Sequence, residues 1–212
     1  MPPHDTYIEL FAGSGAIILN KPPAALSYAV DLNAECLAKI RKHSHGQLGE
    51  IRTVCRDAIS FIDGFNYARS HRTLIYADPP YLHSTRTSRH RYRFELTDAD
   101  HVRLLTALRR TRADIVVSGY PSALYDDELT GWNTREFQAM TRGGPRTEKL
   151  WFNFEPSAVA WATWAGRGFT DRQRIKRKAA RWAANFRDLP AGERLAVLSA
   201  LMLVNAGSHS RQ

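Results

Sequence analysis

Apolar and polar positions follow two different periods along the first two thirds of the chain. Short runs rich in β-branched and aromatic residues have the pattern of strands, and stretches with apolar residues at helical spacing separate them. The predicted strands are Thr6–Phe11, Ser27–Asp31, Ile51–Cys55, Thr73–Ala77, Asp114–Ser118, Asn133–Ala139 and Thr147–Phe154. The predicted helices between them are Ala16–Leu19, Asn33–His43, Ala58–Arg69, Asp98–Arg112 and Ser122–Leu129. This alternation predicts βαβ units around a parallel sheet.

The connection between the last two predicted strands is different, because its turn has only Gly143, Gly144 and Pro145. A loop this short cannot hold a crossover helix, so the two strands should form an antiparallel hairpin. We therefore expect an α/β fold with a mostly parallel seven-stranded sheet and an antiparallel last strand.

The strand pattern stops after Pro156, and two helices are predicted beyond it. Thr170 can cap a helix that runs to Arg187, and Ala191–Asn205 forms a second one. We expect residues 1–156 to form one domain, residues 157–207 to form a basic helical extension packed on it, and residues 208–212 to be a mobile tail. The second helix is apolar nearly all round, which indicates burial or contact with another subunit, such as a homodimer.

A chain of 212 residues fits one domain with a short appendage. Its longest apolar stretch, Leu195–Val204, is about half of what a bilayer requires, and the N-terminus does not resemble a signal peptide. We therefore predict a cytosolic protein that does not bind membranes. Cys36 and Cys55 lack metal-ligand spacing, so we expect small core residues rather than a metal site.

The net charge of +9 is concentrated in two blocks. Residues 82–112 hold 8 basic and 3 acidic residues, and residues 166–212 hold 10 basic and 3 acidic ones, whereas residues 1–81 balance at 8 of each. Local excess of this kind favours a nucleic-acid partner, because each neutralised phosphate releases condensed counterions. The alternative is a solvated basic surface, since arginine and alanine also accumulate in GC-rich genomes.

The first motif, Phe11-Ala12-Gly13-Ser14-Gly15-Ala16, lies between a predicted strand and a predicted helix. Glycine there permits positive φ and close approach of the backbone to a ligand, and helix amides favour electronegative atoms. A nicotinamide site would need a third glycine where Ile18 stands. Asp31 closes the second strand and can hold ribose hydroxyls, or it is a helix N-cap aided by Asn33.

The second motif, Asp78-Pro79-Pro80-Tyr81, follows an apolar strand and is more specific. Two prolines hold the chain extended at the carboxyl end of the strand, where open α/β sheets bind ligands. The Asp78 carboxylate and the Pro79 carbonyl are then two acceptors for an amino group, and Tyr81 offers a face on which a base can stack. The alternative is a rigid turn after a buried strand.

With these motifs the sequence resembles the D12 class of DNA adenine-N6 methyltransferases, the Dam-type enzymes, and in particular their small phage and prophage members. The resemblance rests on the segments YIELFAGSGA, AVDLN, CRDAISFI, YADPPYL, RHRYRFELTDADHVRLL, VVSGY, EFQAMTRGG, TEKLWFNF and RIKRKAARW. It implies a Rossmann-like class I methyltransferase fold, the cofactor S-adenosyl-L-methionine, a DNA partner and an enzyme in the host cytosol.

The resemblance also implies residue roles. The glycine turn would bind the methionine end of the cofactor, Asp31 its ribose, and Asp57 would lie near its adenine unless it is a plain helix cap. The implied cofactor-binding residues are Glu9, Phe11, Ala12, Gly13, Ser14, Gly15, Asp31, Leu32, Asp57, Ala58 and Asp78. The implied catalytic residues are Asp78, Pro79, Pro80 and Tyr81.

Two basic segments are the candidate nucleic-acid-binding surfaces. We expect phosphate or base contacts from Arg86, Arg89, Arg91, Tyr92 and Arg93 after the second motif and from Arg172, Lys176 and Lys178 in the C-terminal helix. The alternative for the first segment is a flexible loop without contacts.

Two departures from the family leave other functions open. Family members begin with a Gly-Gly-Lys segment before the first strand, whereas Met1 stands five residues before Thr6, so a DNA-binding remnant without activity is one alternative. Only 46 residues separate Asp31 from Asp78, which leaves no room for a target-recognition domain, so sequence recognition should rest on residues 82–97. Methylation of adenine in RNA is the other alternative.

Overall fold

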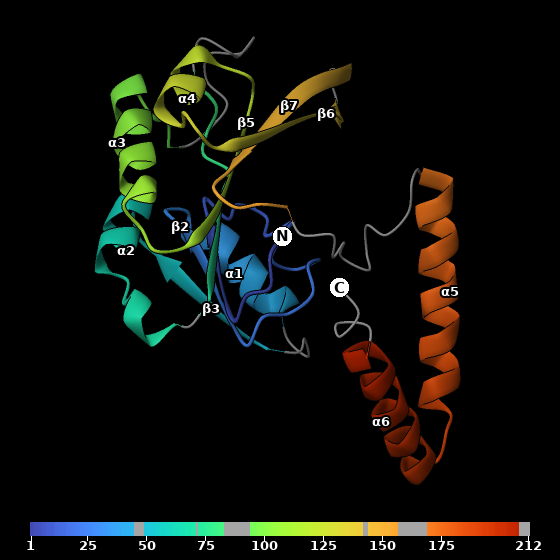
Figure 1. Ribbon diagram of the computed structural model, residues 1–212. Coiled ribbons are helices and arrows are strands. Elements are labelled where there is room, and N and C mark those ends of the chain that lie inside the picture. The colour runs from blue at the N-terminus through green and yellow to red at the C-terminus, as the bar shows by residue number, and fades with distance from the viewer. Residues whose placement is uncertain (45–48, 71, 83–93, 142–143, 157–168, 208–212) are drawn as a thin grey trace. The chain divides into compact units, whose positions relative to one another are not determined.

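The computed structural model describes residues 1–44, 49–70, 72–82, 94–141, 144–156 and 169–207 (Figure 1). It contains one seven-stranded sheet with the order β3-β2-β1-β4-β5-β7-β6. The strands are β1 (Thr6–Leu10), β2 (Leu26–Asp31), β3 (Glu50–Cys55), β4 (Thr73–Ala77), β5 (Asp114–Gly119), β6 (Asn133–Thr141) and β7 (Gly144–Phe152). All neighbours are parallel except β7, which is antiparallel to both β5 and β6. The Rossmann-like α/β fold with a mostly parallel sheet and an antiparallel last strand is thus confirmed.

The helices are α1 (Ala34–His43), α2 (Ala58–Gly64), α3 (Asp98–Arg109), α4 (Ala123–Glu128), α5 (Phe169–Arg187) and α6 (Ala191–Gly207), with a 3-10 turn at Tyr67–Arg69. The predicted helix Ala16–Leu19 was wrong, because these residues form turns. The amides of Leu19 and Lys21 donate to the carbonyls of Gly15 and Ile17, and Pro22 then ends the run. The predicted helix Ala58–Arg69 ends at Gly64, where glycine weakens helix propagation.

Each face of the sheet has its own core. On one face the side chains of α2, α3 and α4, among them Phe61, Leu105 and Tyr125, pack against Ile8, Ile75 and other residues of the central strands. On the other face Leu37 and Ile40 of α1 pack against Tyr7 and Leu74. Because both faces are covered, β1 is buried along its whole length, and β4 and β5 each have only one residue that is partly exposed.

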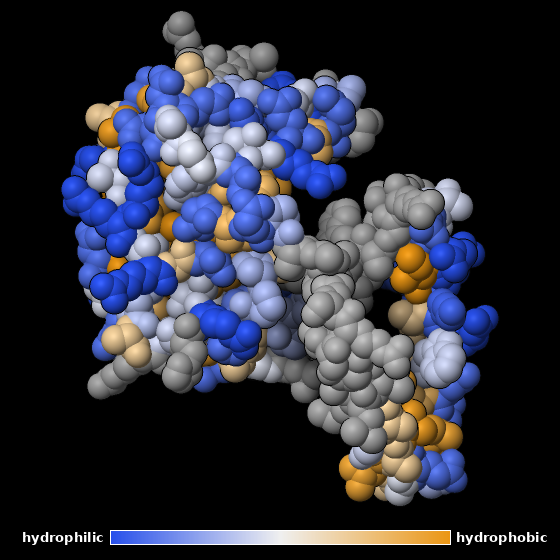
Figure 2. Space-filling model, in the orientation of Figure 1, coloured by the Kyte–Doolittle hydropathy of each residue, from blue (hydrophilic) through white to orange (hydrophobic). Residues whose placement is uncertain are grey.

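The chain divides into two compact units, Met1–Val159 and Ala160–Gln212. In the second unit α5 and α6 follow each other with a break at Leu189-Pro190. Trp182 of α5 is 61% exposed and Leu195 of α6 is 68% exposed, and Figure 2 shows hydrophobic residues beside hydrophilic ones on these helices. None of the described helices combines the length and the apolar character needed to cross a bilayer.

Helix α5 begins at Phe169, two residues before the start implied by a cap at Thr170, so Thr170 lies within the helix rather than at its cap. The predicted tail 208–212 lies outside the described residues. The packing of the extension on the first unit and the homodimer stay predictions.

Candidate active site

The two sequence motifs directly follow the ends of two neighbouring strands, and these ends are in register. Strands β1 and β4 are paired in parallel, and Leu10, the last residue of β1, is opposite Ala77, the last residue of β4. The Asp78 amide donates a hydrogen bond of 3.5 Å to the Leu10 carbonyl. The glycine turn and the Asp-Pro-Pro-Tyr motif therefore start side by side at the carboxyl edge of the sheet, where open α/β sheets bind ligands.

The glycine turn is built from three residues with positive φ. Phe11, Gly13 and Gly15 have φ values of 58°, 49° and 71°. This conformation is strained for a bulky residue such as Phe11, and strain of this kind is found at functional sites. Gly15 also lies close to α1, because a Cβ atom there would come within 2.7 Å of Ile40 Cγ1. Glycine is thus required at position 15 by both backbone conformation and space.

Asp31 connects the end of β2 to the glycine turn. Its Oδ2 accepts a hydrogen bond of 2.8 Å from the Gly13 amide, and its Oδ1 accepts one of 2.7 Å from the Asn33 amide. The alternative that Asp31 is itself the helix N-cap was wrong, because Asn33 is the N-cap residue of α1 and Asp31 holds the Asn33 amide. A carboxylate has about four lone-pair sites, so two acceptor positions stay available for ligand hydroxyls.

A cavity of about 330 Å³ lies at this edge of the sheet. Eleven predicted site residues line it, namely Glu9, Phe11, Ala12, Gly13, Ser14, Asp31, Leu32, Asp57, Ala58, Asp78 and Pro80. Three predicted site residues, Gly15, Pro79 and Tyr81, are not among the lining residues. The cavity thus brings the glycine turn, Asp31 and the Asp78 carboxylate into one space.

Sequence reasoning missed several residues of the cavity wall, which are Ala16, Ile17, Val30, Asn33, Cys36, Arg56, Tyr76, Phe94 and Leu96. Tyr76 could have been found, because it stands two residues before Asp78 in a strand and therefore points to the same side of the sheet. Phe94 and Leu96 carry no such local signal, since they reach the cavity only through the tertiary fold.

Asp57 has the capping role that was predicted as its alternative. It is the N-cap residue of α2, and its Oδ1 accepts hydrogen bonds from the Ser60 amide at 2.9 Å and the Ser60 hydroxyl at 3.0 Å. Asp57 also lines the cavity. A helix cap and a place in the cavity wall are therefore both properties of this residue.

Two acidic residues at the cavity have raised pKa values. Asp78 is an exposed residue, but many protein atoms lie close to its carboxylate. The resulting loss of hydration, together with the charge of Glu148, raises the pKa of Asp78 to about 7. Burial also raises the pKa of Glu9 to about 7, although hydrogen bonds from the Tyr7 hydroxyl and from the Ile17 and Ile18 amides oppose the shift. Both carboxyl groups can therefore exchange a proton near neutral pH.

A buried lysine lies near Glu9. The Lys21 ammonium is 4.4 Å from the centre of the Tyr7 ring, and it donates a hydrogen bond of 2.6 Å to the Pro22 carbonyl. Burial lowers the pKa of Lys21 to about 8, while the charge of Glu9 opposes the shift. The Tyr7 hydroxyl is 2.9 Å from Glu9 Oε2, so Tyr7 connects the two charged groups.

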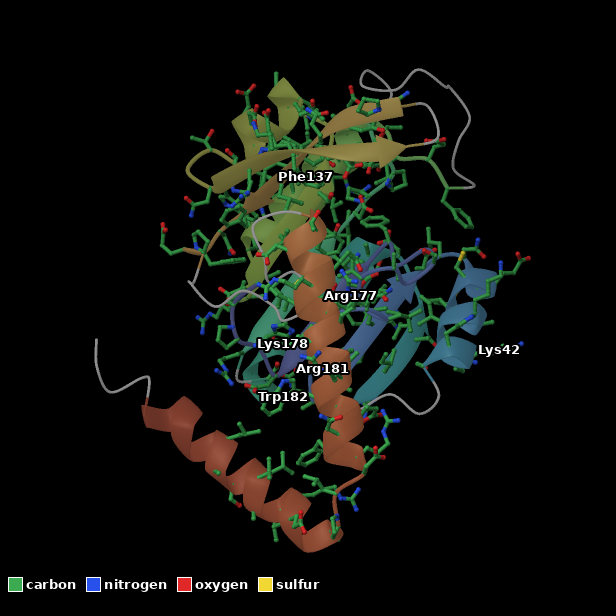
Figure 3. All side chains as sticks on the ribbon, turned by 90° about the vertical axis from the view of Figure 1, so that its right-hand side faces the viewer. Lys42, Phe137, Arg177, Lys178, Arg181 and Trp182 are labelled. Carbon is green, nitrogen blue, oxygen red and sulfur yellow. The ribbon has the colours of Figure 1, made fainter. Side chains whose placement is uncertain are left out.

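The predicted nucleic-acid-binding residues lie mostly outside the described part of the chain. Arg86, Arg89, Arg91, Tyr92 and Arg93 are in the stretch 83–93, and of Arg172 only the backbone is described. Lys176 and Lys178 are exposed on α5, as are Arg177 and Arg181. Figure 3 shows Arg177, Lys178 and Arg181 following one another along this helix.

The cysteines and metal ligands give one correction. Cys55, predicted as a core residue, is exposed, because it ends the edge strand β3, and Cys36 is half-buried in the cavity wall. Within the described residues no three His, Cys, Asp or Glu side chains are grouped as metal ligands would be.

Comparison with known proteins gives only remote structural similarity. No family model and no curated protein match the sequence. An S-adenosylmethionine-dependent methyltransferase from Methanosarcina mazei has a TM-score of 0.49 and 11% identity, over 72% of this chain and 92% of that one. A methyltransferase of the same description from Agrobacterium tumefaciens has a TM-score of 0.47 and 17% identity, over 74% of this chain and 57% of that one. An rRNA methylase from Streptococcus thermophilus has a TM-score of 0.44 and 10% identity, over 71% of this chain and 87% of that one. Similarity at this level assigns no substrate or cofactor to the chain, and membership of the D12 class stays a prediction.

Proposed function

We propose that the protein is an S-adenosylmethionine-dependent methyltransferase that methylates the N6 amino group of adenine in DNA. The observation that carries the proposal is the position of the Asp78 carboxylate in the same cavity as the glycine turn and Asp31. A methyl donor and an amino acceptor must meet in one space, and this cavity offers acceptor groups for both.

The chemistry of the cavity fits S-adenosylmethionine. Gly13 and Ser14 allow close approach to the backbone, Asp31 retains acceptor positions for ribose hydroxyls, and Val30 and Leu32 give an apolar wall for an adenine ring. When bound, this molecule would supply an electrophilic methyl group on a sulfonium. Glu9, whose pKa is raised to about 7, lies in the same cavity wall as the turn. In its ionised form it would attract the positive sulfonium of the ligand.

Asp78 would prepare the amino nitrogen for reaction. The lone pair of an adenine amino group is delocalised into the ring, so N6 is a poor nucleophile. When the Asp78 carboxylate and the Pro79 carbonyl accept the two amino hydrogens, they favour the geometry in which the lone pair points out of the ring plane. Positive charge then develops on N6, and the Asp78 charge stabilises it more than it stabilises the ground state.

The proton balance also involves Asp78. The bond from N6 to the methyl group would form as the bond between that methyl group and the sulfonium sulfur breaks, and one N6 proton would pass to the Asp78 carboxylate. A carboxyl group with a pKa of about 7 can accept this proton and return it to solvent at neutral pH. The carboxylate form is the active one, so turnover should fall as the pH drops below about 7.

The substrate class follows from geometry and charge. An adenine within a duplex cannot reach a cavity of this kind, so the base must leave the stack, at a cost of a few kcal/mol. Aspartate as the first residue of the Asp-Pro-Pro-Tyr motif fits adenine amino methylation. The exposed Lys176 and Lys178 of α5 are candidates for contacts with the phosphate backbone.

The test is transfer of a labelled methyl group from S-adenosylmethionine to duplex DNA and, in parallel, to total RNA. We expect N6-methyladenine in DNA and a loss of roughly 10²-fold to 10³-fold in turnover for Asp78→Ala, with DNA binding retained. Asp127→Ala, which removes an exposed acid on α4, is the matched control and should keep full activity.

Three outcomes would contradict the proposal. Methylation of RNA alone would assign the RNA substrate class. A normal turnover of Asp78→Ala would remove the role of the carboxylate. If calorimetry gave no heat with S-adenosylmethionine and no transfer occurred, the chain would be a non-catalytic binding protein.

A further inference from the structure

The Tyr81 ring packs against a second aromatic ring, and Tyr81 does not line the cavity. Its ring centre is 4.2 Å from that of Tyr120, the residue that follows β5, and the two ring planes are tilted by 48°. On Tyr120 lies Arg146 of β7, whose guanidinium carbon is 5.7 Å from the ring centre and whose Nη1 is 3.5 Å from the hydroxyl. The motif of one strand is thus supported by residues from two other strands.

Glu148 is the hydrogen-bond partner of Tyr81. The Tyr81 hydroxyl donates a hydrogen bond to the Glu148 carboxylate. Glu148 lies in β7 two residues after Arg146, so both side chains point to the same face of the hairpin. The hydrogen bond fixes the Tyr81 ring within its plane, while Tyr120 limits its tilt.

Glu148 is also a charged neighbour of Asp78. Among the described residues, the titratable groups that interact electrostatically with Asp78 are Glu9 from β1, Tyr76 from β4, Tyr125 from α4 and Glu148 from β7. After burial, the charge of Glu148 is what raises the pKa of Asp78. Burial raises the pKa of Glu148 itself, the Tyr81 hydrogen bond lowers it, and no basic side chain of the described residues offsets the burial.

We propose that Glu148 is a positioning residue for the proposed methyl transfer, which orients the Tyr81 ring and adds a second negative charge that acts on Asp78. This inference rests on the proposed function of the cavity. The interaction of a half-buried acid with a second acid lowers stability, so the position of Glu148 is best explained by the substrate. Two acids at one edge favour a group that is a hydrogen-bond donor and becomes positive during reaction, such as an exocyclic amino group.

The charge and the hydrogen bond of Glu148 can be separated by three variants. Glu148→Gln keeps a side chain that can accept the hydrogen bond but removes the charge, Tyr81→Phe removes the hydrogen bond alone, and Glu148→Ala removes both. Glu136→Gln is the matched control, because Glu136 is opposite Lys149 and therefore lies on the other face of the hairpin.

We expect Glu148→Gln to move the acid limb of the pH profile of kcat to lower pH, with KM for DNA changed less than about threefold. Tyr81→Phe and Glu148→Ala should raise KM for DNA by roughly fivefold to tenfold, because a loosely held ring stacks less well on the base. Glu136→Gln should change neither quantity. A merely structural role of Glu148 would lower stability without moving the pH profile.

A measurement that does not depend on activity completes the test. In ¹³C NMR titrations of the full chain, Glu148→Gln should lower the titration midpoint of the Asp78 carboxyl, and Glu136→Gln should leave it unchanged. An unchanged Asp78 midpoint in Glu148→Gln would overturn the inference, even if the wild-type protein methylates DNA. Absence of methyl transfer by the wild-type protein would instead overturn the proposed function and leave the coupling of the two acids standing.

Discussion

Glu9 is the most buried acidic group beside the cavity, with 3% of its surface exposed. Its side chain is held by the Tyr7 hydroxyl and two backbone amides, which are the hydrogen bonds that usually keep a carboxylate ionised. Burial nevertheless outweighs them, and the pKa rises from 4.5 to about 7. The folded protein therefore binds protons at Glu9 that the unfolded chain has already released.

This shift makes the stability depend on pH. A carboxyl group with a raised folded-state pKa contributes most below the unfolded value of 4.5, and its contribution is lost as the pH rises through about 7. In Glu9→Gln we expect the change in the free energy of unfolding between pH 5 and pH 8 to shrink by up to about 3 kcal/mol. Urea denaturation at both pH values measures it, with Glu136→Gln as the exposed control. Equal pH dependence in Glu9→Gln and wild type would contradict the pKa of Glu9.

At the scale of elements, the glycine turn after β1 packs against α1. Gly15 has positive φ and faces the side chain of Ile40, which is fully buried in α1. Any side chain at position 15 must displace Ile40 or move the turn. The packing of α1 on the sheet and the shape of the cavity are thus fixed by the same glycine.

Gly15→Ala should therefore lower the free energy of unfolding by about 2–3 kcal/mol, because strain and overpacking act together. It should also weaken binding of S-adenosylmethionine, measured by calorimetry. Gly131→Ala is the matched control, since Gly131 has a φ of 85° but no atom within 4 Å of an added Cβ. This control should lose only about 1 kcal/mol. Similar losses in both variants would show that space at Ile40 does not matter.

Elements were predictable from the sequence where their signal is local. The alternation of strands and helices, the hairpin of β6 and β7, and the position of both motifs at strand ends all follow from short patterns. The turn at residues 16–20 was mistaken for a helix, because its pattern does not reveal that Gly13 and Gly15 redirect the backbone and that Pro22 follows at once.

The partners of Asp78 were not predictable for a different reason. Glu148 follows Asp78 by 70 residues, and it reaches the site only because β7 inserts between β5 and β6. Phe94 and Leu96 likewise enter the cavity wall from the segment before α3. Contacts of this kind depend on strand order, which local patterns do not specify.

At the scale of the whole molecule, basic charge is concentrated in the C-terminal unit. Lys176, Arg177, Lys178 and Arg181 are all exposed within two turns of α5, and Trp182 follows them. A helix with this pattern has the charge density that phosphate contacts require. If α5 does not contact nucleic acid, removing these charges should leave the salt dependence of nucleic-acid binding unchanged.

Replacing Lys176, Arg177 and Lys178 by Gln should reduce the slope of log K against log salt for duplex DNA by about 0.9 for each phosphate that the variant no longer neutralises. Fluorescence anisotropy between about 50 and 200 mM salt measures the slope. The control is the triple Gln variant of Lys39, Arg41 and Lys42, three exposed basic residues of α1 in the part of the sequence where the charges balance, and it should keep the wild-type slope. An unchanged slope in the α5 variant would exclude this helix from DNA binding.

The central place of β1 also affects how the chain folds as it is made. Strands β1, β2 and β3 come from the first 55 residues, but the other edge of β1 is completed only by Thr73–Ala77. A nascent chain on the ribosome therefore exposes an unpaired apolar strand until β4 has emerged. During that interval the future cavity lacks the residues that follow β3 and α2, namely Tyr76, Asp78, Pro80, Phe94 and Leu96.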